Sequence, residues 1–90
     1  MSIFGDTLEV VRDAVIFADP MDLLVIGAPL DEYDAEVVDL THRLVDEGDP
    51  ADSLTVIEVF RHWFGGKIIK VADAQAVASH IRENLPFFAI

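Results

Sequence analysis

The chain has 90 residues, 52% of them hydrophobic, no cysteine and a formal net charge of −11. That length supports one hydrophobic core, so we expect a single domain spanning residues 1–90. The apolar content argues against disorder, and the absence of cysteine excludes disulfides, thiol catalysis and thiolate metal sites. No apolar run reaches the roughly 20 residues that cross a bilayer, and the first residues lack the features of a signal peptide. We therefore expect a cytoplasmic protein without membrane contact.

The charge is unevenly distributed along the chain. Residues 1–60 carry fifteen acidic residues against two arginines, a balance of −13, whereas residues 61–90 have a balance of +2. An acidic field repels nucleic-acid phosphates and anionic membranes, and it attracts basic proteins. The sequence therefore disfavours nucleic-acid binding. Two interpretations of the acidity stay open, namely solubility alone and contact with a basic protein partner.

The first predicted helix spans residues 3–18, where apolar side chains recur at helical spacing on a wide face that includes Phe17. Residues 20–26 are ambiguous between strand and helix. Their run of leucine, valine and isoleucine suits a buried strand, but the preceding Asp19-Pro20 pair is typical of a helix start. We favour one or two helical turns there.

The clearest predicted helix spans residues 31–47, between a Gly27-Ala28-Pro29 stop and a Gly48-Asp49-Pro50 stop. Tyr33 lies on its apolar side, so we expect a core tyrosine whose hydroxyl group finds a hydrogen-bond partner. The opposite side carries a charged stripe that we expect to face water. The stripe consists of Glu32, Glu36, Asp39, Arg43 and Asp46.

Two further helices complete the predicted fold. One is capped by Asp52 or Ser53 and runs to about Phe64, with Trp63 expected in the core and Thr55 facing outward. The last is expected to be capped by Asp73 and to end at Pro86, with a narrow apolar seam that includes Ala74 and Ala78. The sequence thus predicts an all-α fold, a compact bundle of four amphipathic helices plus one short helix.

Three motifs in the first half of the chain are also found together in a protein family. They are Asp19-Pro20, Gly27-Ala28-Pro29 and the helix start Asp31-Glu32-Tyr33-Asp34-Ala35-Glu36. In this order they resemble an uncharacterised family of short, acidic, helical bacterial proteins. The resemblance extends to residues 60–65 and 76–81, and it implies a helical fold and a bacterial origin but no activity. Immunity proteins of bacterial toxin systems are similar in size and charge, which is an analogy only.

The acidic cluster around that helix start is the candidate functional site. Its carboxylates are compatible with capping of the first helical turn, with contact to arginine and lysine side chains of a partner, or with a divalent cation. The alternating ligands and central glycine of a calcium loop are absent, which disfavours the cation. The candidate partner-binding residues are Asp31, Glu32, Asp34, Glu36, Asp39 and Asp46.

No pattern for catalysis stands out. His42, His62 and His80 lack the spacing of a helical zinc pair and are predicted to face solvent, and no nucleophile elbow or phosphate-binding loop is present. We expect neither a catalytic residue nor a metal or cofactor.

Two functional hypotheses follow for a non-enzymatic protein. The first is a small acidic protein-binding module, in its concrete form an immunity-type inhibitor that occludes a basic, nuclease-like partner. The second is a self-associating structural domain. Its homodimer contact would use either the Ala74 and Ala78 seam or the terminal residues Phe87, Phe88 and Ile90.

Overall fold

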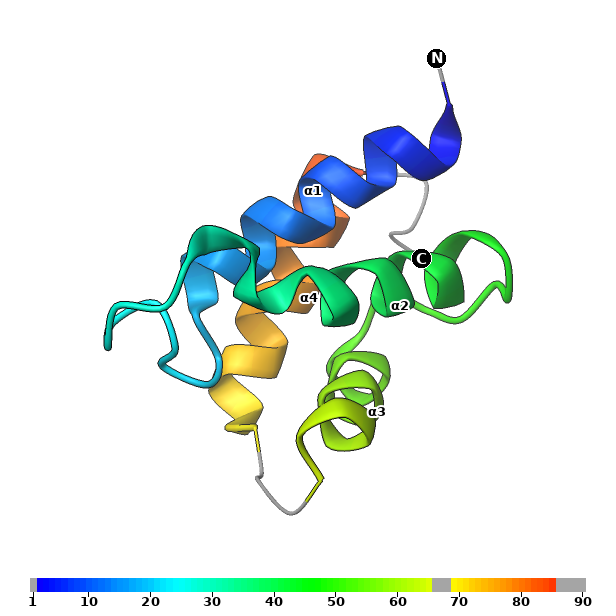
Figure 1. The fold of residues 1–90 in the computed structure, drawn as a ribbon. Coiled ribbons are helices and arrows are strands. Elements are labelled where there is room, and N and C mark those ends of the chain that lie inside the picture. The colour runs from blue at the N-terminus through cyan, green and yellow to red at the C-terminus, as the bar shows by residue number, and fades with distance from the viewer. Residues whose placement is uncertain (1, 66–68, 86–90) are drawn as a thin grey trace.

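The computed structural model describes residues 2–65 and 69–85, which form four α-helices and one short 3₁₀ helix (Figure 1). The helices are α1 (Ile3–Ala18), η1 (Leu30–Tyr33), α2 (Asp34–Val45), α3 (Ser53–Phe64) and α4 (Val71–Asn84). The described residues contain no strand. This confirms the predicted all-α bundle of four amphipathic helices. The radius of gyration of 12.0 Å matches the value of about 12 Å expected for a folded chain of this length.

The helices pack in a closed order in which each has two neighbours. Helix α1 contacts α2 and α4, and α3 contacts the same two helices. The centre of the core is formed by the largest fully buried side chains, which include Tyr33, Phe60, Leu40 and Ile81. Burial of these apolar stripes is what stabilises helices of 12 to 16 residues, because isolated helices of that length are marginal in water.

Polar caps define two of the helix starts. The Ser2 hydroxyl accepts a hydrogen bond from the backbone N–H of Gly5 at 3.2 Å and caps α1. Asp52 accepts one from Thr55 at 3.0 Å, which settles the predicted choice between Asp52 and Ser53. Helix α3 ends at Gly65, whose φ of 61° is accessible to glycine without a side-chain clash.

Two predicted helix starts need correction. Residues 31–33 belong to η1, and the α-helical part begins only at Asp34 and ends at Val45. Helix α4 begins at Val71 after Lys70, so Asp73 lies inside its first turn and does not cap it. An acidic side chain in that turn still interacts favourably with the helix dipole, and this explains why the sequence resembled a helix start there.

The segment 20–26 is neither helix nor strand but a series of turns. Asp19 has a φ of 45° and ends α1 in the left-handed conformation, and Asp22 is also left-handed with a φ of 56°. Two left-handed residues so close together prevent a continuous helix. Asp19-Pro20 is therefore the end of α1 and not the start of a new helix, and the short helix of the fold is η1.

Two burial predictions are also wrong. Phe17 is 83% exposed, because it lies two positions from the buried Val15 and therefore on nearly the opposite side of α1. Thr55, expected to face water, is buried in the first turn of α3. His42 and His62 are exposed as predicted, whereas His80 is half-buried. No helix in the described part of the chain is long and apolar enough to span a membrane.

Candidate functional site

Five of the six predicted partner-binding residues lie at least partly on the surface. Asp31, Glu32 and Asp46 are exposed, and Asp34 and Asp39 are half-buried. They are spread over η1, α2 and the residue after α2.

Glu36 is the exception, because its side chain points into the protein and is 5% exposed. It lies three residues after Tyr33 and four before Leu40, both of which are in the core, so helical geometry places it on the same side. Its Oε2 atom has no hydrogen-bond partner among the described residues. Burial raises the pKa of the Glu36 carboxyl group, and the charges of Glu32 and Asp34 add to that increase.

Both arginines of the acidic half are engaged in ion pairs. Arg12 of α1 lies 3.3 Å from Asp34, which joins α1 to α2. Arg43 of α2 lies 3.2 Å from Glu58 of α3 and 3.7 Å from Asp39. Such partly exposed pairs stabilise a protein only slightly. Because residues 1–60 contain no other arginine and no lysine, the remaining carboxylates give this part of the surface an excess of negative charge.

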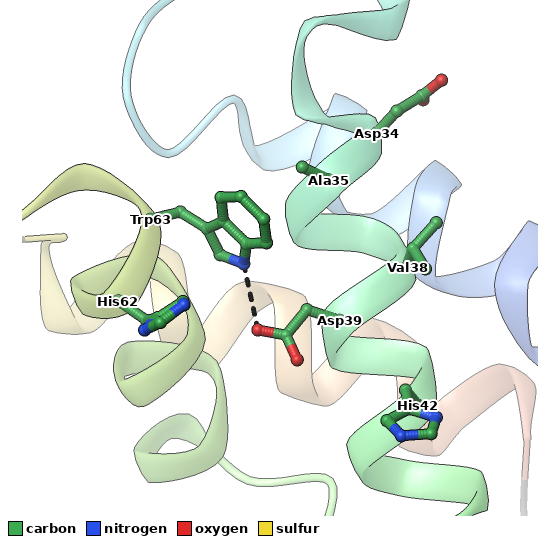
Figure 2. A pocket seen from close by; sticks show the side chains of 7 residues that line it. All are labelled: Asp34, Ala35, Val38, Asp39, His42, His62 and Trp63. Carbon is green, nitrogen blue, oxygen red and sulfur yellow. Dashed lines mark hydrogen bonds between the residues drawn. The ribbon is translucent and has the colours of Figure 1, made fainter.

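An open groove of about 560 Å³ lies between α2 and α3 (Figure 2). Its apolar part includes Ala35, Val38 and Trp63, and its polar part consists of Asp34, Asp39, His42 and His62. Figure 2 shows the Trp63 indole extending from α3 toward α2. A smaller hollow of about 200 Å³ lies beside it and is lined by Arg12, Ile16, Asp31 and Asp34. Asp34 lines both hollows, so the acidic surface continues from η1 into the groove.

Trp63 was predicted to lie in the core, but 47% of its surface is exposed. Its Nε1 atom donates a hydrogen bond to Asp39 Oδ2 at 3.0 Å, and the His62 ring packs edge-on against it at 5.4 Å. Phe60 and Phe64, one helical turn apart, stack on each other at 5.9 Å and fill the interior in its place. The polar N–H of an indole was the available sequence signal, because that group needs an acceptor.

Tyr33 is a core residue with a hydroxyl partner, as predicted. Its Oη atom donates to Asp19 Oδ1 at 2.7 Å and accepts a hydrogen bond from the Met21 N–H at 3.0 Å. The two Asp19 oxygens also accept the N–H groups of Leu24 and Val25, both at 3.1 Å. Sequence reasoning missed this role of Asp19.

The hydrogen bonds alter the acidity of both partners. Burial raises the pKa of the Asp19 carboxyl group, but the hydrogen bonds from Tyr33 and the loop N–H groups outweigh that effect and hold this pKa below its usual value. Burial and the bond to Asp19 raise the pKa of Tyr33. The pair therefore fixes the loop that follows α1, and its carboxylate is occupied by structural contacts.

Two other predicted sites have different outcomes. Ala74 and Ala78 are fully buried against the other helices, so their seam is not available for a dimer contact. The terminal residues Phe87, Phe88 and Ile90 lie outside the described residues. Within residues 2–65 and 69–85, no three histidine, aspartate or glutamate side chains gather in a way that would hold a metal ion.

No protein-family model, curated protein or solved structure was found to match this chain. The resemblance to short acidic bacterial proteins therefore stays a prediction. Function must be inferred from the geometry and charge of the surface.

Proposed function

We propose that this chain is a small acidic protein-binding module, without catalytic activity, that contacts a basic protein through the exposed carboxylates of η1 and the half-buried Asp34 and Asp39 of α2. The observation that carries this proposal is that Asp31 and Asp34 line one hollow while Asp34 and Asp39 line the adjoining groove, which has an apolar part. Specific interfaces combine such an apolar centre with a polar rim.

Electrostatics supplies the mechanism of the proposed binding. A negative surface accelerates the encounter with a positively charged partner and orients it before contact. Asp31 and Glu32 are exposed and form no ion pair with the described residues, so their oxygens are open to arginine and lysine side chains of the partner. Rim charges of this kind act mainly on the association rate and its salt dependence.

The concrete form of the proposal is an immunity-type inhibitor that acts in the bacterial cytoplasm. A nuclease presents a cationic surface to its substrate, because phosphate contacts dominate nucleic-acid affinity. An acidic module that covers that surface blocks substrate entry without any chemistry of its own. The charge balance of residues 1–60 and the resemblance described above support this form.

The proposal is tested by pull-down from the source organism with a pair of charge-matched variants. Asp31→Asn combined with Glu32→Gln removes two charges from the proposed surface, and Glu9→Gln combined with Asp13→Asn removes two exposed charges from α1. We expect to recover a basic partner, and its recovery should fall about tenfold with the first pair. The reason is that this pair removes two exposed ion pairs, each of which contributes up to about 1 kcal/mol. The second pair should change little. Absence of a basic partner, or recovery that is insensitive to salt, contradicts the proposal.

Self-association is the second candidate, favoured by large apolar side chains that the fold leaves in solvent. Val25 and Ile26, in the loop held by Asp19, are 80% and 77% exposed. Replacing both by serine should convert a dimer to a monomer in light scattering, whereas Leu54→Ser, at another exposed apolar position, should not. A wild-type chain that is already monomeric removes this candidate.

A further inference from the structure

The groove between α2 and α3 has the size of a binding site for a short peptide segment. Its volume of about 560 Å³ lies in the range of about 300–1,000 Å³ typical of ligand sites. Trp63 and Val38, which both line the groove, are 47% and 48% exposed. Figure 2 shows the Ala35 side chain on the side of α2 that faces Trp63, whereas Val38 extends from the other side of that helix, and both residues line the groove.

The charges beside this apolar surface select the chemistry of the occupant. Asp34 and Asp39 both line the groove, and each is only partly occupied by its arginine and indole contacts. A carboxylate accepts about four hydrogen bonds, so each retains capacity for a further donor. A guanidinium group suits this arrangement, because it pairs with carboxylates and also stacks on the face of an indole.

We propose that the groove receives a basic segment of the protein partner, in which an apolar side chain packs against Trp63 and Val38 while a neighbouring arginine pairs with Asp34 or Asp39. This inference rests on the proposed function, because it names the part of the basic partner that the acidic surface recognises. It adds an anchor to the general attraction between opposite charges. Buried anchors of this kind carry most of the binding energy in protein interfaces.

Two synthetic hexapeptides of equal charge separate the anchor from the general attraction. One alternates arginine with leucine, and the other alternates arginine with glycine. Trp63 is the only tryptophan of the chain, so its fluorescence reports directly on the groove. We expect the leucine peptide to shift the Trp63 emission and to bind about tenfold more tightly than the glycine peptide, as one well-packed anchor provides.

Two variants with the same charge change locate the binding. Ala35→Arg places a cation and a long side chain in the groove, and Gln75→Arg does so at an exposed position of α4. Affinity for the leucine peptide should fall about tenfold or more with Ala35→Arg and stay within about threefold of wild type with Gln75→Arg. Val38→Ser, which removes apolar surface without changing the charge, should abolish the preference for leucine. Circular dichroism confirms that each variant is folded.

The possible results distinguish this inference from the proposed function. Equal affinities for the two peptides, or equal losses in Ala35→Arg and Gln75→Arg, overturn the groove as the anchor site and leave the acidic surface in place. If neither peptide binds at about 20 mM salt, where surface charges are weakly screened, both proposals fail.

Discussion

Removal of the Tyr33 hydroxyl group should destabilise this fold substantially with little change in side-chain volume. Tyr33→Phe deletes the donor to Asp19 and the acceptor of the Met21 N–H. The ring stays in place against Phe60 and Phe64, at centroid distances of 6.1 and 6.5 Å, so no large cavity forms. The substitution therefore isolates the polar contribution of the residue.

The expected loss follows from the two contacts. A hydrogen bond to a charged group contributes about 1.5–3 kcal/mol, and a buried N–H left without a partner costs about 1–3 kcal/mol. Because these terms overlap, we expect the free energy of unfolding to fall by about 2–4 kcal/mol, out of a total of about 5–15 kcal/mol for a domain. At about 4–8 °C per kcal/mol, the melting temperature should fall by about 10 °C or more.

Urea denaturation followed by Trp63 fluorescence and circular dichroism measures this loss. Asp19→Asn and the double variant complete a cycle, in which we expect a coupling energy of about 1 kcal/mol or more between the two side chains. Gln75→Arg, at an exposed position of α4, is a control that should leave the stability unchanged. A loss below about 0.5 kcal/mol in Tyr33→Phe, or strict additivity in the cycle, would refute the assigned role of the pair.

The pH dependence offers an independent check of the same pair. The pKa of Asp19 is lowered in the folded protein, so its ionised form contributes stability that is present above the unfolded value near 3.9. That contribution is lost as the pH falls through the folded pKa. Tyr33→Phe removes the strongest hydrogen bond that lowers this pKa. The stability difference between wild type and variant should therefore shrink below about pH 4.

Two buried polar atoms without a partner among the described residues, Thr7 Oγ1 and Glu36 Oε2, give two further predictions. Glu36→Gln should stabilise the fold by about 1 kcal/mol at pH 7 by removing a buried charge. Because the pKa of Glu36 is raised, its protonated form contributes stability that is complete below the unfolded pKa near 4.3 and is lost as the pH rises through the folded pKa. Thermal melts near pH 4 should therefore show no gain in stability for Glu36→Gln. Thr7→Val should raise the free energy of unfolding by about 1 kcal/mol. Thr7→Ser, which keeps the hydroxyl group, is the control. A Thr7→Val variant that is less stable than wild type would show that the hydroxyl group is hydrogen-bonded.

The helices themselves were predictable from local patterns. The bounds of α1 agree with the predicted residues 3–18, and α3 ends where its stop signal at Gly65 was expected. Helical periodicity, caps and glycine stops involve residues within about one turn of each other, so they can be predicted from the sequence. The turns at 20–26 were not predictable in this way, because the bonds that hold them include those of the Tyr33 hydroxyl group with Asp19 and Met21, fourteen and twelve positions away.

The candidate site was predictable only in part. The excess of carboxylates near the start of α2 was evident from the sequence, but the binary pattern placed Glu36 in water and Trp63 in the core. Both errors arise because helical periodicity assigns residues to the apolar or the polar side of a helix but does not show where the neighbouring helices lie. Packing buries the side of α2 that carries Glu36 and Leu40, and Asp39 supplies a polar partner for the partly exposed Trp63 indole.

The amino-acid sequence by itself determined four amphipathic helices and a charge imbalance concentrated in residues 1–60, because these properties depend on composition and on residues close together in the chain. Only the tertiary structure decided which carboxylates face solvent and where an apolar groove opens beside them. Trp63 and Asp39 are 24 positions apart and meet only when α3 packs against α2. The groove is therefore a property of helix packing, which no local pattern encodes.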